Sequence, residues 1–357
     1  MTLQIALLGG EGIGPEVVEA TAEVLEHVLG DVDFVRPIHG KPALDAHGDA
    51  LPEASKQVCR DADAVIFGAT QKHCHPVLRF LRWGLVTHAN LRPARNRPRL
   101  DSPLKNDQAV DLLVVRENLE GEYPGREGEL SEFTRRWPEL RDNFDREVPR
   151  EGRFTVRVTT EEGTRRVVAT AIDKAKKRRR RATARQTPLV TVVTKANVLR
   201  YTDGWFREIA FEMLEEAGME YEHFFVDDAA RRLVEHPWTF DVIVCPNLFG
   251  DILSDITAEL VGGMGMAPSG CVGVENAYFE SVHGSAPDIA GQGVANPLAT
   301  VLSARMMLDH LGLEDLSDRI DHAVDDLLAD GSVLTPDLGG SASTDQVTRA
   351  LIDRLDD

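Results

Sequence analysis

Short apolar runs alternate with longer amphipathic segments along most of the chain, and this alternation limits the folds it can adopt. The runs are typical of strands because glycine, proline or charged residues bound them. Between them lie segments with helical periodicity, at 16–29, 205–216 and 297–311. Strands that alternate with helices form β-α-β units, so the pattern predicts an α/β fold with a largely parallel sheet. The expected strands are 4–8, 64–67, 111–116, 154–159, 189–194 and 241–245.

The composition of the chain is typical of a globular protein without a membrane span or a disulfide framework. The chain has 357 residues, 42% of them hydrophobic, which is enough for two domains or one large α/β unit with a real core. No apolar run reaches about 18 residues, and residues 2–8 are typical of a strand rather than of a secretion signal. We therefore expect a cytoplasmic protein with no membrane partner. Its 4 cysteines show no C-x-x-C spacing, which indicates neither a disulfide framework nor a zinc knuckle.

Charge argues against a nucleic-acid partner, because a net charge of -19 repels phosphates on average. The basic run 174–181 is the exception. It ends an expected helix, where cations complement the helix dipole and stay solvated, and nucleic-acid binding is the alternative interpretation. The segment 125–152 is dense in charge and lacks periodicity, so we expect a surface loop.

A glycine-rich turn, Gly-Gly-Glu-Gly-Ile-Gly-Pro at 9–15, follows an expected strand and precedes an expected helix. Dinucleotide-binding loops have the same context. The G-x-G-x-x-G spacing does not fit, however, because Pro15 stands where a glycine is required. We therefore expect a tight strand-to-helix turn and not the pyrophosphate loop of a standard Rossmann fold.

Acidic residues provide a candidate metal site. Asp251 and Asp255 are four positions apart, so on a helix both carboxylates share one face about one turn apart. A hard divalent cation would convert their repulsion into a pair of oxygen ligands. A solvated acidic helix face is the alternative.

Arginines form a second candidate cluster, made of Arg79, Arg82, Arg92 and Arg116. Arg79 and Arg82 are spaced i, i+3, and Arg116 ends an expected strand, where sites form in α/β folds. Guanidinium groups bind carboxylates bidentately, so their convergence would suit a di- or tricarboxylate substrate. Taken singly, each arginine has the simpler interpretation of a surface ion-pair partner.

Several short motifs occur along nearly the whole chain: Gly12-Ile13-Gly14-Pro15-Glu16, Asn90-Leu91-Arg92-Pro93, Val115-Arg116-Glu117-Asn118, Thr194-Lys195-Ala196-Asn197-Val198-Leu199, 247–255, 283–291 and Pro336-Asp337-Leu338-Gly339-Gly340. In order and spacing the chain resembles the metal-dependent β-decarboxylating dehydrogenases, which include isopropylmalate, isocitrate, homoisocitrate and tartrate/malate enzymes. The resemblance implies an isopropylmalate-dehydrogenase-like two-domain α/β fold. It places a discontinuous cofactor-binding domain at 1–95 and 260–357, and a substrate, metal and dimerisation domain at 96–259. It also implies a homodimer with shared active sites.

Carried over position by position, the resemblance makes Tyr123 and Lys195 the catalytic pair that handles protons. It implies Mg²⁺ or Mn²⁺ held by Asp251 and Asp255, with Asp227 and Lys195 supplied by the partner subunit. The residues implied to bind the substrate carboxylates are Arg82, Arg92, Arg116 and Asn197. Those implied to bind the cofactor are Thr70, His283, Gly284, Ser285, Ala286, Asp288, Ala295 and Asn296.

The resemblance also bears on cofactor and substrate. Asp288 occupies the position that hydrogen-bonds the adenosine ribose and repels a 2′-phosphate, which implies NAD. Arg79 lies where homoisocitrate dehydrogenases carry an extra arginine, so the best expectation is a 3-substituted malate of the homoisocitrate or isocitrate type. Isopropylmalate and tartrate/malate stay open as substrates. A non-catalytic regulatory subunit and a metal-dependent binding module without a redox role are the alternatives of another class.

Some positions depart from the family pattern. Glu11 replaces the usual aspartate before Gly-Ile-Gly-Pro, and the loop 71–76 is shorter than in homoisocitrate enzymes. Trp83 and His88 are unusual within the arginine segment, and the excursion at 125–152 is longer than expected.

Overall fold

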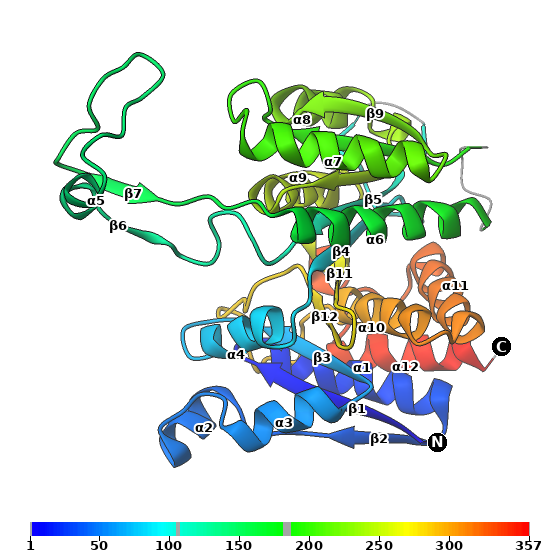
Figure 1. Cartoon of the computed structure of the whole chain (residues 1–357). Helices are drawn as coiled ribbons and strands as arrows, with labels where there is room; N and C mark the ends of the chain where they lie inside the picture. Colours follow the sequence, from blue (N-terminus) through cyan, green and yellow to red (C-terminus); the bar gives the residue numbers. More distant parts are fainter. Residues whose placement is uncertain (1, 105–107, 181–186, 357) are drawn as a thin grey trace.

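The computed structural model describes residues 2–104, 108–180 and 187–356, with side chains for all of these except Arg179 and Arg180. Within those ranges ten strands form one sheet in the order β2-β1-β3-β12-β11-β4-β5-β10-β8-β9 (Figure 1). The strands are β1 (Leu3–Gly10), β2 (Val32–Val35), β3 (Ala64–Ala69), β4 (Ala89–Arg95), β5 (Asp111–Glu117), β8 (Leu189–Thr194), β9 (Glu220–Phe225), β10 (Val242–Cys245), β11 (Pro268–Val272) and β12 (Ala277–Ser281).

The sheet is parallel at both ends and antiparallel in its middle. β12 with β11, β11 with β4, and β4 with β5 are the antiparallel pairs, and the pairs on either side of them are parallel. The prediction of an α/β fold with a largely parallel sheet is therefore confirmed. The antiparallel centre joins two groups of parallel strands into one continuous sheet.

Helices cover both faces of the sheet. They are α1 (Gly14–Leu29), α2 (Gly40–His47), α3 (Glu53–Asp61), α4 (His75–Arg79), α6 (Glu161–Arg180), α7 (Thr202–Glu216), α8 (Val226–Glu235), α9 (Asn247–Glu259), α10 (Leu298–His310), α11 (Glu314–Asp330) and α12 (Thr344–Leu355), with a π-helical turn η1 (Phe80–Gly84) and short 3₁₀ turns at Pro237–Thr239, Met264–Met266 and Pro336–Leu338. No helix in the described ranges is long and apolar enough to cross a membrane.

Successive side chains of a strand point to opposite faces of the sheet, so alternate residues pack into separate hydrophobic cores. On β1, Ile5 and Leu7 pack with α1 and α10–α12 in the largest cluster, which continues along the sheet to α6 and α7. Ala6 and Leu8 point to the opposite face and pack with α3 and α4. A third cluster lies under α8 and α9 on the other half of the sheet. The result is a three-layer arrangement of helices around the sheet.

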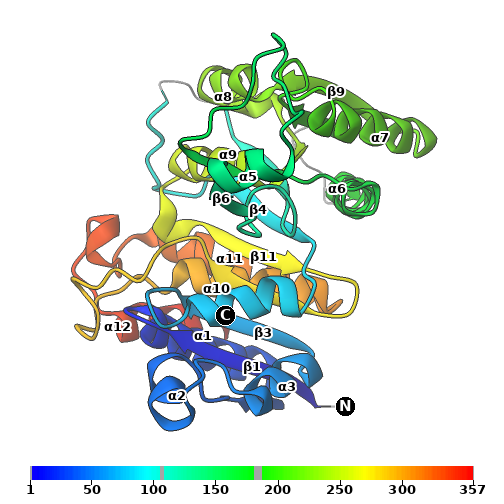
Figure 2. The ribbon, with the colours of Figure 1, turned by 60° about the vertical axis from the view of Figure 1, so that its left-hand side comes forward.

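The segment after residue 120 corrects two predictions. Residues 125–152 are not only a loop, because they contain β6 (Glu127–Glu129) and α5 (Leu130–Arg136). The strand expected at 154–159 is shortened to β7 (Arg153–Thr155), which pairs antiparallel with β6 rather than with the main sheet. Figure 1 shows this two-stranded ribbon and α5 projecting from the body of the molecule, and in Figure 2 α5 and β6 lie in front of the body. Ring contacts of Phe133 with Trp137 and Phe154 hold it together.

The basic run lies at the end of α6, as expected, except that Arg181 falls outside the described residues. The expectation that the run is solvated is wrong for Arg178. Its guanidinium pairs with the carboxylates of Asp111 and Asp241, each at 2.8 Å, and it is largely buried. Arg178 therefore ties α6 to the starts of β5 and β10.

Candidate active site

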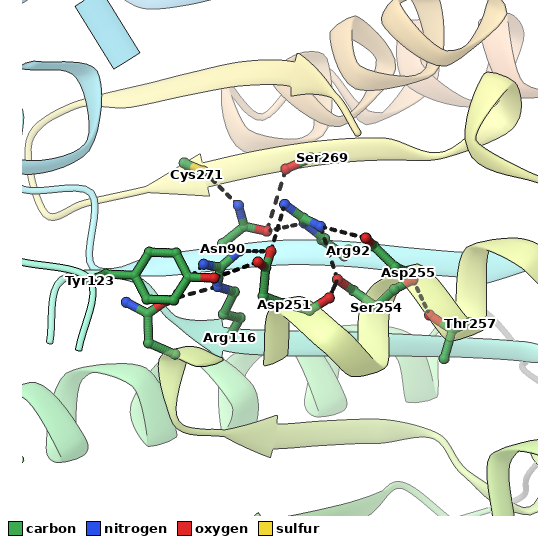
Figure 3. Close-up of polar contacts among 11 residues, drawn as sticks. Asn90, Arg92, Arg116, Tyr123, Asp251, Ser254, Asp255, Thr257, Ser269 and Cys271 are labelled. Atoms are coloured by element: carbon green, nitrogen blue, oxygen red, sulfur yellow. Dashed lines mark hydrogen bonds and ion pairs between the residues drawn. The ribbon is translucent and has the colours of Figure 1, made fainter. Parts of the chain in front are cut away.

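Helix α9 begins directly after β10 and brings Asp251 and Asp255 over the ends of β4 and β5 (Figure 3). Gly250 makes this close approach possible. A Cβ atom at residue 250 would lie 2.5 Å from the Cβ of Arg116, so any larger residue would push α9 away from β5. The predicted helix with two carboxylates on one face is thus packed against the strand that carries a predicted substrate-binding arginine.

Arg116, near the end of β5, is 1% exposed. Its Nε and one Nη donate to the Oδ1 of Asn247 at 3.0 and 2.7 Å, and its other Nη pairs with the carboxylate of Asp251. Burial opposes ionisation of Asp251, but Arg116, the Tyr123 hydroxyl, Arg92 and Arg82 together hold its pKa below the ordinary value. Asp251 is therefore an anion in this site.

Arg92 on β4 contacts Asp255, the second aspartate of the pair, and lies near Asp251 as well. One Nη donates to the Ser254 Oγ at 2.9 Å and to the Asp255 carboxylate at 3.3 Å, and Nε donates to the Asn90 Oδ1 at 3.1 Å (Figure 3). Its other Nη lies 3.6 Å from Asp251. Arg92 and Arg116 therefore flank the aspartate pair from adjacent strands.

Tyr123 closes the site from the segment that follows β5. Its hydroxyl donates to Asp251, and the Arg116 guanidinium lies 4.7 Å from the centre of its ring. Burial, together with the charge of Asp251, raises the pKa of Tyr123 in spite of Arg116. The hydroxyl therefore keeps its proton at neutral pH and can donate it.

Arg82, on the π-helical turn η1, lies beside this group. It is 8% exposed, and its guanidinium stacks over Tyr123 at 5.7 Å from the ring centre. Its Nε has no hydrogen-bond partner among the described residues. Tyr278 and the carboxylate of Glu280 also lie against this guanidinium. The free Nε can still donate to an oxygen of a bound ligand, which a carboxylate would supply.

The structure does not bring every predicted residue into this group. Arg79 lies exposed at the end of α4, and its side chain makes no hydrogen bond or ion pair with the described residues. Asn197 is also exposed. Lys195 at the end of β8 pairs with Asp227 at the start of α8, and the Asp227 side chain is 67% exposed.

The carboxylates fit the oxygen ligands that Mg²⁺ and Mn²⁺ prefer. Asp255 shows a pKa raised by burial and by Asp251, which a cation at this position would reverse. Within the described part of this single chain, however, no three His, Cys, Asp or Glu side chains lie close enough to hold a metal. Asp227 pairs with Lys195 and does not join Asp251 and Asp255. The third ligand of the predicted metal site is therefore not supplied by the same chain.

A second group of predicted residues lies where three loops meet. The amide of Ile13 donates to the Ser285 carbonyl at 2.9 Å, and a Cβ on Gly12 would lie 1.9 Å from that oxygen. The amide of Glu11 donates to Ala69, next to Thr70, at 2.9 Å. The turn predicted at 9–15 is therefore tight because two other loops press against it.

Two polar atoms in these loops are buried without hydrogen-bond partners among the described residues: Thr70 Oγ1 and His283 Nε2. Buried polar atoms are normally satisfied, so this pair fits a polar ligand such as a dinucleotide. Burial lowers the pKa of His283, which keeps the ring neutral.

The other predicted cofactor residues surround the same loops. Ala286 has a positive φ of 37° and Asp288 is exposed. The amide of Ala295 donates to Glu16 at 3.1 Å, and Asn296 donates to Asp337 at 2.9 Å. Gly284 is exposed, and a Cβ there would meet nothing within 4 Å.

Sequence reasoning missed three polar residues that orient the arginines. Asn247 accepts from Arg116, while Asn90 and Ser254 accept from Arg92. Asn90 and Asn247 lie at the ends of quoted motifs, each beside a strand terminus, which is the signal that could have identified them. Glu11 was noted only as a departure; its carboxylate accepts from the amides of Gln71, His73 and Cys74 and so shapes the short loop after β3.

Comparison with known proteins agrees with this geometry. The chain matches the isocitrate/isopropylmalate dehydrogenase family over residues 4–353. It is 38% identical to a 3-isopropylmalate/3-methylmalate dehydrogenase of Methanocaldococcus jannaschii over 353 residues, covering 99% of this chain and 98% of that protein. It is also 38% identical to an isocitrate/homoisocitrate dehydrogenase of Thermus thermophilus over 362 residues, covering 99% of both.

Among solved structures, the isocitrate dehydrogenase from Methylococcus capsulatus superposes with a TM-score of 0.86 at 35% identity, covering 100% of both chains. The fold, the match over nearly the whole length and the level of identity agree. The chain belongs to the isocitrate/isopropylmalate dehydrogenase family and is an oxidoreductase of the decarboxylating-dehydrogenase type.

Proposed function

We propose that the protein catalyses the NAD-dependent and divalent-metal-dependent oxidative decarboxylation of a 3-substituted malate. The observation that carries this proposal is the convergence of Arg82, Arg92 and Arg116 around Asp251 and Tyr123. Three guanidinium groups around one hydrogen-bond donor suit a substrate with at least two carboxylates. The buried and unpartnered Nε of Arg82 supports an anionic ligand in particular.

In this proposal the arginines hold the carboxylates and thereby orient the C2 hydroxyl and the departing carboxylate. A bound Mg²⁺ or Mn²⁺ would polarise the hydroxyl oxygen, and NAD⁺ would accept the hydride from C2. Lys195 takes the hydroxyl proton. After the β-carboxylate has left as CO₂, Tyr123 returns a proton to the carbon that carried it, as its retained proton allows.

The proposal includes a homodimer with shared sites. Support comes from Asp227 and Lys195, which pair with each other, while Asp227 remains largely exposed and apart from the other two aspartates. A second copy could therefore present both residues to the site. The domains at 1–95 with 260–357 and at 96–259 belong to the same proposal. The antiparallel strands β11 and β4, which join two groups of parallel strands, support that division.

NAD is the proposed cofactor. The carboxylate of Asp288 makes no hydrogen bond or ion pair among the described residues, and it is exposed beside the loop of His283 and Ser285. A carboxylate in that state can accept hydrogen bonds from ribose hydroxyls and repels a 2′-phosphate.

The proposed substrate is a tricarboxylate of the homoisocitrate or isocitrate type, with 3-isopropylmalate and tartrate/malate as alternatives. Arg79 supports the first choice, since it lies three positions before Arg82 with its side chain unengaged by described residues. A third substrate carboxylate would give it a partner.

The test is NADH formation with homoisocitrate, isocitrate, isopropylmalate and tartrate, each with Mn²⁺ and with NAD⁺ or NADP⁺. Tyr123→Phe and Lys195→Met should abolish turnover. Tyr201→Phe, at a tyrosine that is 95% exposed, and Lys41→Met, at an exposed ion pair, are the matched controls and should retain it. Absence of NADH with every acid, while the acids still bind, would instead support the regulatory subunit.

A further inference from the structure

The side chain of Arg157 lies where three segments with proposed catalytic residues meet. It follows β7, and only 12% of the side chain is exposed. One Nη donates to the Glu122 carboxylate at 3.2 Å, directly before Tyr123. The guanidinium also lies 4.8 Å from the ring centre of Phe249 on α9, two residues before Asp251.

Asp203 provides the third connection. Its Oδ1 lies 2.8 Å from the other Nη of Arg157, as an ion pair without hydrogen-bond alignment. Its Oδ2 accepts from the backbone amide of Lys195 at 2.6 Å. That amide opens the turn in which Val198 and Leu199 donate to the Lys195 carbonyl at 2.9 and 2.8 Å. Asp203 thus holds the backbone where Lys195 leaves β8.

The carboxylates of Glu122 and Asp203 explain why an arginine is required at position 157. Asp203 is 0% exposed, and the second carboxylate oxygen of Glu122 is buried without a hydrogen-bond partner among the described residues. Arg157 is the guanidinium that faces both carboxylates. A planar guanidinium can stack on Phe249 while its edge reaches two acids, which a lysine ammonium cannot do.

We propose that Arg157 is a positioning residue that acts through Glu122, Asp203 and Phe249. It holds Tyr123 and α9, which serve one active site of the proposed dimer, and the backbone of Lys195, which serves the other. This inference rests on the proposed function, which gives Tyr123 and Lys195 their catalytic roles. Arg157 itself touches neither of those side chains. A misplacement of about 1 Å at a reacting group can cost about a hundredfold in rate, so the position matters.

Kinetics separate positioning from binding. In Arg157→Met we expect kcat to fall at least about tenfold, with KM for the acid changed less than about threefold, because the substrate-binding arginines are untouched. Arg157→Lys should recover part of kcat, since it restores the charge but not the stacking. Arg153→Met, which removes a 73% exposed arginine from the same ribbon, should behave as the unmodified protein. A KM effect with unchanged kcat would overturn the proposal.

Hydrogen exchange tests the same idea without turnover. In Arg157→Met, amides in 120–124 and 195–199 should exchange at least about tenfold faster, while 3–10 in β1 stays unchanged. Should that variant fail to fold, Arg157→Lys and Glu122→Gln are measured instead, with the same two segments expected to open. Unchanged exchange in both segments would refute the positioning role. An unmodified protein without dehydrogenase activity would refute the proposed function and leave this measurement interpretable.

Discussion

The hydroxyl of Tyr123 donates a hydrogen bond to the carboxylate of Asp251, so the proposed proton donor and a proposed metal ligand are in direct contact. Asp251 simultaneously pairs with the buried Arg116. The carboxylate is thus held in place before any ligand arrives. Preorganisation of this kind limits the reorganisation that a reaction would require.

Arg116→Met should lower the free energy of unfolding by about 1.5–3 kcal/mol, because it removes the charge-assisted hydrogen bonds that the buried guanidinium makes to Asn247 and Asp251. Urea unfolding measures the change. Arg153→Met, at an exposed ion pair, should cost no more than about 1 kcal/mol. Equal effects of the two substitutions would contradict the central role of Arg116.

Gly250→Ala should reduce kcat about tenfold or more, because the new Cβ lies 2.5 Å from the Cβ of Arg116 and displaces α9. Steady-state kinetics check this. Gly204→Ala is the matched control, since its Cβ on α7 would meet nothing within 4 Å, and it should raise stability by about 0.5–1 kcal/mol.

Glu117→Gln should change how stability depends on pH. Burial raises the pKa of Glu117 from 4.5 to about 7 in the folded protein, so the unfolded state loses its proton first as pH rises. Stability therefore falls between about pH 4.5 and pH 7, by up to about 3 kcal/mol from this group. The variant should lose less stability than the unmodified protein between pH 5 and pH 7 in urea unfolding. Glu139→Gln is the exposed control, and its stability should depend on pH as that of the unmodified protein does. The same pH dependence in Glu117→Gln would show that Glu117 does not titrate in this range.

Asp255→Asn should weaken Mn²⁺ binding at least about tenfold, because it removes one carboxylate from the proposed site. Titration calorimetry measures the affinity. Mn²⁺ at about 100 times its Kd should also stabilise the unmodified protein by about 2.7 kcal/mol. Glu259→Gln, one turn further along α9, should leave binding unchanged; a loss there equal to that of Asp255→Asn would argue against a specific site.

Asp288→Asn should raise KM for NAD⁺ about tenfold, equivalent to about 1.4 kcal/mol, and should improve the relative use of NADP⁺. Initial rates with both cofactors test this. A preference for NADP⁺ in the unmodified protein would remove the basis for the assignment.

Much of the fold was predictable from local pattern. The runs at 4–8, 64–67, 111–116, 189–194 and 241–245 became β1, β3, β5, β8 and β10, because fully buried parallel strands are continuously apolar. The antiparallel strands β4, β11 and β12 were not predicted. β4 contains Arg92 and Pro93, and β11 begins at Pro268, so these segments form strands only because neighbouring strands provide hydrogen-bond partners.

Residue types and their spacing already specified the chemistry that the chain can carry: guanidinium groups, paired carboxylates, a tyrosine and a lysine in ordered motifs. Folding alone settled which of them meet. Asp251 lies more than a hundred positions after both Arg92 and Arg116 in the chain. The three meet because β4 pairs with β5 and α9 packs against β5 at Gly250. Arg157 shows the same limit, since a charged residue after a short ribbon strand carries no local signal. Its burial between Glu122, Asp203 and Phe249 arises only from long-range packing.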